Sequence, residues 1–281
     1  MYRDDNMAFL TVLPDPSNKR SYWGAADSSG DAGPGFASVK LTSDQKIMMS
    51  RTNSQRVISR AAAGQKWNID IGYHPMTRAE FNPVYTFLLQ QRGPLTPFYV
   101  ELPQYASSQN ALFNTDTNES GEATYNTNTF AAVGAQAAGA TSVLLTQSSG
   151  WKLKNAAGAD IKTANSNTTD EPFNIPAVGD VCTFNDSTNT NHKKVYMVTY
   201  IETYYNEHYH GNPPGTTGTP ADDVRRIRVG ITPPLSKSVA ADKTATFKGV
   251  QFKVILPSAV REYSLGTDNL YKFNLKLEEY L

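Results

Sequence analysis

The sequence predicts a mainly β protein with one principal helix, in which an outer β domain carries a small inserted β-barrel or β-sandwich domain. Amphipathic strands lie at both ends of the chain, a single helical segment follows the first of them, and a polar, charge-poor stretch precedes a run of short strands. The 281 residues suffice for one large domain or two smaller ones. We place an extended N-terminal arm at 1–38, the outer domain at 39–103 and 246–281, and the inserted domain at 104–245 with a polar linker at 104–140.

The clearest strand lies in the segment KWNIDIGY. Its apolar residues occupy every second position, namely Trp67, Ile69, Ile71 and Tyr73. Polar or small residues fill the positions between them, which is the period of a strand with one buried face. We therefore predict a half-buried strand in this segment.

A helix of about 78–91 follows this strand, and two starts compete for it. In one, Thr77 with Glu80 three residues later forms a capping box. In the other, Asn82 is the N-cap and Pro83 is the first helical residue. Apolar residues at helical spacing and a Gly-Pro stop support the helix with either start.

Further strands complete the outer domain. Alternating apolar residues predict strands in PFYVELP, GVQFKVILP and YKFNLKLEEYL. An amphipathic strand such as the last one usually pairs, because an unpaired edge invites aggregation. We also predict a hairpin of 37–43 and 46–52, joined by SDQK.

The composition changes after the outer strands. Between 104 and 151 the charged residues are Asp116, Glu119 and Glu122, and Asn, Thr, Ser, Ala and Gly dominate. Such a stretch is typical of an extended loop, a linker or weakly patterned β structure. The short strands predicted beyond it lie in ATSVLLTQ, GDVCTFND, KKVYMVTYIETYY and RRIRVGITPPL. Their spacing favours a small barrel or sandwich.

The charge balance names no partner class. Lys plus Arg and Asp plus Glu both number 26, so no basic excess predicts sequence-specific nucleic-acid binding or an anionic membrane partner. No apolar run approaches the roughly 18 residues of a membrane helix. The acidic start does not fit a signal peptide, and Met7 is an alternative to Met1 as the first residue. We expect synthesis in a reducing cytoplasm and no membrane partner.

The single cysteine, Cys182, excludes an internal disulfide and any multi-cysteine metal site. It alternates with neighbouring apolar residues in GDVCTF. This pattern favours a small residue packed in a strand over a reactive thiol.

Few residues offer catalytic or metal-binding chemistry. His208 and His210 lie two apart beside Glu207, and on a strand these side chains would suit zinc or iron. The segment lacks an obvious third ligand and lies beside a Gly- and Pro-rich stretch, so a solvated loop tip is the preferred interpretation. His74 and His192 have the surroundings of turn or surface histidines. We expect no metal site.

Catalytic motifs are also missing from the sequence. It has no GxSxG elbow, and the glycines of SSGDAGPGFAS lack the lysine and preceding strand of a phosphate loop. Glu101, Glu278 and Glu279 are the carboxylates nearest to apolar residues, and we expect all three on the solvent side of their strands. The sequence therefore predicts a protein that is not an enzyme and has no cofactor.

Several of these sequence patterns, taken in order along the chain, resemble those of a known class of protein. SRTNSQRVISRAAAGQKWNIDIGYHPMTRAEFNPVYTFLLQQRGPLTPFYVELPQY resembles virion proteins of tailed bacteriophages, with a basic stretch, a Trp-containing strand, a helix, QRG and a strand ending in proline. The central strands are similar to inserted β modules of phage tail proteins. YKFNLKLEEYL resembles their last strand.

The resemblance implies a structural protein of the distal tail or baseplate hub, made in the host bacterial cytoplasm and located in the virion tail. Such proteins carry a tail-tube-like β-sandwich domain whose strands join those of neighbours into a ring around the DNA channel. The expected partners are three or six copies of the chain itself and other tail or baseplate proteins. On this interpretation the arm of 1–38 lies on an adjacent subunit.

Seven residues are candidates for the interface between subunits. The basic candidates for intersubunit ion pairs are Arg51, Arg56, Arg60 and Arg92, for which ordinary solvation is an equal alternative. The aromatic candidates are Trp67, Tyr271 and Phe273, because aromatic residues are enriched where chains meet.

Two other function classes remain open from the sequence. One is a carbohydrate-binding module, in which the inserted domain contacts a host-surface glycan and the segment of about 106–245 binds polysaccharide alone. The other is a metal-dependent or glycosidase enzyme, which predicts stoichiometric metal or turnover.

Overall fold

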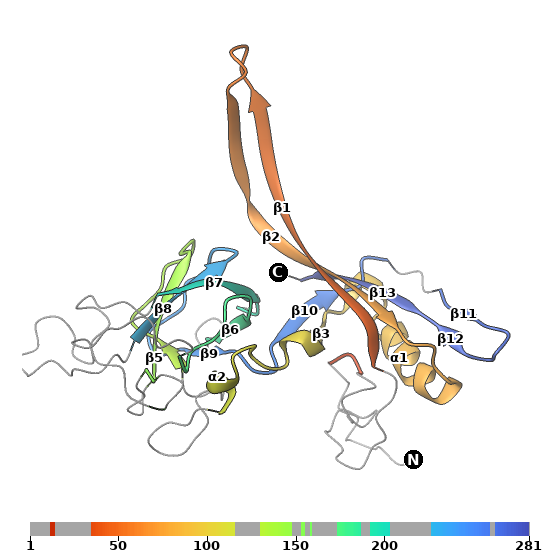
Figure 1. Cartoon of the computed structure of the whole chain (residues 1–281). Helices are drawn as coiled ribbons and strands as arrows, with labels where there is room; N and C mark the ends of the chain where they lie inside the picture. Colours follow the sequence, from red (N-terminus) through yellow and green to blue (C-terminus); the bar gives the residue numbers. More distant parts are fainter. Residues whose placement is uncertain are drawn as a thin grey trace, which may run out of the picture. The chain divides into compact units, whose positions relative to one another are not determined.

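The computed structural model of the chain forms two compact units, Met1–Glu101 with Gln251–Leu281, and Leu102–Val250. We call them the sheet unit and the barrel unit (Figure 1). The sequence placed the corresponding boundaries at 103/104 and 245/246. The structure describes residues 12–14, 35–115, 130–147, 153–154, 158, 173–186, 192–202, 226–258 and 262–280. The described residues are mainly β, as the sequence predicts.

The sheet unit contains a five-stranded antiparallel sheet. Its strands in spatial order are β1 (Phe36–Arg51), β2 (Val57–Tyr73), β13 (Asn274–Glu279), β10 (Gln251–Ile255) and β3 (Phe98–Glu101). Strands from the two ends of the chain therefore lie next to each other. The barrel unit is an insertion between β3 and β10, which precede and follow it in the chain and pair directly with each other.

One face of this sheet is apolar and packs on α1 (Arg78–Gln90). The alternating residues of the KWNIDIGY strand are all buried, which confirms the predicted pattern; they are Trp67, Ile69, Ile71 and Tyr73. Helix and sheet meet through aromatic rings. Phe87 lies 5.3 Å from Phe98, and Phe81 lies 5.8 Å from Phe273, measured between ring centroids.

The helix uses the first of the two predicted starts. The Glu80 carboxylate accepts hydrogen bonds of 2.8 Å from both the backbone N–H and the hydroxyl of Thr77. The start at Asn82 is wrong, because Pro83 lies inside the helix. The start at Thr77 is preferred over the start at Asn82 because it adds a full turn of helix, and this turn buries Phe81. After the helix the chain makes the short 3-10 turn η1 (Gly93–Leu95).

The predicted hairpin of 37–43 and 46–52 does not form. Residues 36–51 make one continuous strand, and its partner is β2. SDQK contains no glycine, proline or asparagine to reverse the chain. The chain turns instead at Thr52–Arg56, where Gln55 has a φ of 63° and donates its N–H to the Thr52 carbonyl at 2.8 Å.

The C-terminal strand predicted in YKFNLKLEEYL is split at Phe273. Its first part is β12 (Tyr271–Lys272), which pairs with β11 (Ser264–Leu265) in a separate two-stranded hairpin. The second part is β13 of the main sheet. At the other end of the chain, Leu13 is buried and donates its N–H to the Tyr99 carbonyl at 2.8 Å. Of the arm expected at 1–38, residues 12–14 therefore lie along β3 and 36–38 belong to β1, while 1–11 and 15–34 lie outside the described residues.

The barrel unit is a closed six-stranded barrel, which decides between the predicted barrel and sandwich. In order around the barrel the strands are β4 (Phe130–Ala132), β5 (Ser142–Gln147), β8 (Arg226–Thr232), β7 (Tyr196–Glu202), β6 (Val181–Asn185) and β9 (Thr244–Thr246). The segment expected as a linker at 104–140 supplies β4, together with η2 (Pro103–Tyr105) and α2 (Ala111–Thr115). β4 has only two inward-facing residues, Phe130 and Ala132, which is too short a pattern to predict a strand.

The barrel closes around aromatic residues. Phe113 of α2 lies 5.8 Å from both Phe130 and Phe247, in edge-to-face arrangements that favour specific packing. The segment before α2 is attached by Asp180, whose carboxylate accepts from the Ser108 hydroxyl and from the backbone N–H of Gln109 at 3.2 Å. The first residues of the insertion are thus part of the barrel unit.

His192 is buried, so its prediction as a surface histidine is wrong. Its Nε2 lies 2.6 Å from the Tyr196 hydroxyl, which also accepts a 3.0 Å hydrogen bond from the Ser236 N–H. Its Nδ1 has no hydrogen-bond partner. A second proton on Nδ1 would therefore find no acceptor. Burial chiefly, then the positive charge of Lys237, lowers the pKa of His192 from its ordinary value.

We expect the barrel unit to lose stability as the pH falls below about 6.5, the unperturbed histidine pKa. The lowered pKa means that the unfolded chain takes up a proton that the folded chain resists, so the contribution of His192 is complete above that pH and declines below it. Urea unfolding between pH 8 and 5 measures this slope. His192→Gln should flatten it, whereas His74→Gln, at an exposed position, should not.

We also expect Cys182 to be unreactive in the folded protein. Burial, with a smaller contribution from the negative charge of Asp180, raises the pKa of the Cys182 thiol to about 12. Modification by a thiol reagent at pH 8 should be at least about a hundred-fold slower than that of free cysteine. One thiol per chain should react after unfolding in guanidinium. Fast modification of the folded chain would show that the barrel opens readily.

Candidate assembly surface

The most prominent surface of the sheet unit is a hairpin that continues beyond the sheet (Figure 1). β2 pairs with β13 only along Asn68–Gly72, whereas its pairing with β1 continues to Arg51 opposite Val57. From here on we call residues 46–60 the arm; this hairpin is a different segment from the N-terminal arm predicted at 1–38. The 16 residues of β1 span about 50 Å at ~3.3 Å per residue, so a large part of this length lies past the other strands.

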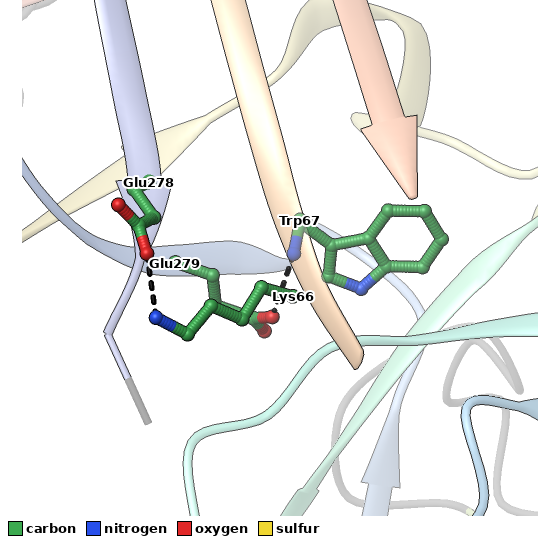
Figure 2. A network of polar contacts seen from close by, with 4 residues as sticks. All are labelled: Lys66, Trp67, Glu278 and Glu279. Carbon is green, nitrogen blue, oxygen red and sulfur yellow. Dashed lines mark hydrogen bonds and ion pairs between the residues drawn. The ribbon is translucent and has the colours of Figure 1, made fainter. Parts of the chain in front are cut away.

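Two acidic residues anchor the arm where β2 leaves the sheet (Figure 2). The Glu279 carboxylate accepts a 3.1 Å hydrogen bond from the backbone N–H of Trp67. On the other face of the sheet, Lys66 and Glu278 form an ion pair of 2.5 Å. Glu279 is buried, so its prediction as an exposed residue is wrong. Its place in the strand alternation, beyond Leu277, put it on the apolar face despite its charge.

An irregularity marks the start of the arm. Gln45 is opposite Gln65, and the next paired residue, Ile47, is opposite Ala61. β2 thus has two more residues than β1 across this step. Gly64 lies there with a φ of 105°, a conformation that favours glycine. Such bulges change the direction of a strand pair, so this one sets the angle at which the arm leaves the sheet.

Both faces of the arm expose large apolar side chains. Opposed residues of an antiparallel pair share a face. One face therefore carries Ile47, Met49 and Val57, and the other carries Met48 and Ile58. These five side chains are between 49% and 72% exposed. A strand pair that only continued the sheet would have one polar face, so the arm has the composition of a surface that is covered on both sides.

The charge of the arm is entirely positive. Between residues 45 and 69 the sequence has five basic residues and no acidic one; they are Lys46, Arg51, Arg56, Arg60 and Lys66. Each face also combines apolar and basic residues, since Arg51 is opposite Val57 and Arg60 is opposite Met48. A complementary surface would combine apolar and acidic residues.

The outer edge of β1 is the second feature suited to assembly. β1 ends the strand order of the sheet, and none of the described strands pairs with its outer edge. The opposite edge, β3, is contacted by Val12 through a parallel bridge to Tyr99. A long edge strand such as β1 is a template for pairing with another chain.

The structure brings three of the seven predicted interface residues together. Arg51, Arg56 and Arg60 are exposed on the arm, whereas Arg92 is exposed just after α1. The three aromatic candidates contribute to their own unit. Trp67 and Phe273 are buried, and Tyr271 stacks on Phe81 at 4.5 Å between ring centroids.

The sequence reasoning missed the apolar residues of the arm. Their signal was the runs KIMM and VI, in which neighbouring apolar residues point to opposite faces of a strand. Such runs usually indicate a strand buried on both faces. Their long stretch of basic neighbours without an acidic residue was the sign that this strand pair is not buried within its own unit.

Metal-binding groups and membrane-spanning helices are missing from the part of the chain that the structure describes. Its His, Cys, Asp and Glu residues form no group suited to a metal ion. The metal candidates Glu207, His208 and His210 lie outside the described residues. None of the described helices is long and apolar enough to span a bilayer.

No known protein family and no curated protein matches the chain. The arm, with its anchor and apolar faces, is therefore the main guide to function.

We expect Glu279→Ala to lower the free energy of unfolding of the sheet unit by about 1–3 kcal/mol, because it leaves a buried backbone N–H without its acceptor. Glu279→Gln keeps a carbonyl acceptor and should recover part of this loss. The control Glu278→Gln breaks a half-exposed ion pair and should cost less than about 1 kcal/mol. Urea unfolding followed by circular dichroism measures all three. An equal loss for Glu278→Gln and Glu279→Ala would refute the anchor.

Proposed function

We propose that this protein is a non-enzymatic structural subunit of a bacteriophage tail, in the distal tail or baseplate, that assembles with copies of itself into a ring. The observation that carries the proposal is the arm, whose two faces expose five large apolar side chains beside four basic residues. The unpaired outer edge of β1 supports it as a second contact.

The free energy of burying these apolar side chains favours assembly through the arm. Full burial stabilises a side chain of this size by about 1.5–3 kcal/mol. Five such side chains on one arm offset a large part of the roughly 4–15 kcal/mol that association costs in lost freedom. The hydrogen-bonded turn at the tip of the arm keeps its two strands in register before any contact forms, so little further ordering is needed.

The second face of the sheet carries opposite charges in register. Lys40 is opposite Asp70, which in turn is opposite Lys276 on the next strand. Two rows further along the same face, Asp44 is opposite Lys66, which pairs with Glu278. Opposite charges in register largely cancel each other, so this face would attract a passing polyanion only weakly. The assignment to a phage tail also draws on the resemblance of the sequence.

We expect wild-type protein to form rings or larger assemblies as its concentration rises, and Met48→Asp with Ile58→Asp to weaken this at least about ten-fold. Both substitutions lie on one exposed face of the arm, so the fold should be preserved. Light scattering over a concentration series, with negative-stain images, measures the assembly.

The matched control is Leu95→Asp, which replaces a side chain that is 77% exposed elsewhere on the sheet unit and should leave assembly unchanged. Equal assembly of the arm variant and wild type would contradict the role of the arm. A wild-type chain that stays monomeric and binds polysaccharide would instead support the carbohydrate-binding alternative.

A further inference from the structure

The β11–β12 hairpin presents a second exposed apolar surface on the sheet unit. Tyr263 is 50% exposed and Leu265 is 54% exposed. Glu262 and Asp268 are exposed beside them, Lys272 is the basic residue within 262–272, and Arg261 precedes this stretch in the sequence. This surface therefore combines exposed apolar side chains with two exposed carboxylates, which are the groups that the apolar and basic side chains of the arm would pair with. We call residues 262–272 the acceptor hairpin.

Aromatic contacts hold the acceptor hairpin in place against α1. The Tyr263 ring lies 5.1 Å from that of Phe81 and 5.4 Å from that of Tyr85. Tyr271 stacks on Phe81, and its N–H donates to the Met76 carbonyl at 2.8 Å. These contacts hold the hairpin and the ring of the exposed Tyr263 on a rigid support, which lowers the cost of ordering them in an interface.

The arm and the acceptor hairpin lie at opposite ends of β2. The arm holds the first residue of this strand, Val57, and the acceptor hairpin pairs with Met76, just beyond the last residue, Tyr73. The 17 residues of β2 separate them by about 50 Å. Figure 1 shows the arm and the β11–β12 hairpin pointing away from each other. An arm therefore cannot reach the acceptor hairpin of its own chain.

From this geometry we infer that the arm of one copy docks on the acceptor hairpin of the next copy. The inference rests on the proposed function and names the contact within it. Basic and apolar side chains of the arm meet Glu262, Asp268, Tyr263 and Leu265 of the neighbour. Each subunit donates an arm at one end and accepts an arm at the other, so the contact is head-to-tail and closes when the rotation per subunit divides a full turn.

A charge exchange tests this contact. The arm variant carries Arg51→Glu and Arg60→Glu. The acceptor variant carries Glu262→Lys and Asp268→Asn, in which asparagine retains a side-chain oxygen for the N–H of Leu270. We expect each variant to weaken self-association at least about ten-fold at low salt, because like charges then meet. The variant that carries all four substitutions should recover most of the loss.

Mixing the arm variant with the acceptor variant gives a second readout. The acceptor variant still has a normal arm, and the arm variant still has a normal acceptor hairpin. In a head-to-tail arrangement that alternates the two variants, a normal arm meets a normal acceptor hairpin at one contact and the exchanged charges meet at the next, so the mixture should assemble while neither variant associates alone. Sedimentation velocity with one variant labelled measures this directly.

The possible outcomes separate this inference from the proposed function. Wild-type assembly that resists the acceptor substitutions, or additive losses in the four-fold variant, would overturn the head-to-tail contact alone. Wild-type protein that stays monomeric at every concentration would overturn the ring as well. Monomeric wild-type protein that binds DNA or anionic vesicles through the arm would assign its basic residues to a different partner.

Discussion

The hydrogen bond from the Trp67 N–H to the buried Glu279 carboxylate is the interaction on which the arm depends. It lies one residue beyond the last paired position of β2 and β13, where the backbone of β2 loses its neighbour on that side. A side chain there replaces the missing strand as acceptor. This lets β2 leave the sheet without an unpaired buried donor and continue as one strand of a free hairpin.

The sheet unit thus presents different surfaces at the two ends of β2. At one end of β2 an anchored, basic and apolar hairpin extends from the sheet, and at the other end an aromatic cluster on Phe81 fixes a second hairpin with acidic and apolar residues. The same strand joins the two surfaces. A rigid link of this kind favours repeated contacts between copies, since the position of one surface determines that of the other.

The barrel unit is stabilised in a different way. Its small strands gain little from sheet pairing alone, and Phe113 from a short helix completes the aromatic core that closes them. Asp180 connects this helix segment to the strands, and His192 with Tyr196 and Ser236 forms a buried polar group. Residues from a polar, unpatterned segment therefore contribute to the core of this barrel.

The sequence by itself determined the elements whose signals are local. The period-2 apolar pattern of β2, the Thr77 and Glu80 capping box and the strand around Cys182 all follow from neighbouring residues. It did not determine the continuous β1, the burial of Glu279 and His192, or the two-sided arm. Each of these depends on residues that are distant in the chain. Pairing with β2 makes β1 continuous, and the end of β13 at Glu279 leaves the arm uncovered. The polar partner of Glu279 lies on β2, and that of His192 is Tyr196. Partners that are distant in the chain leave no local pattern, so only the tertiary structure could decide them.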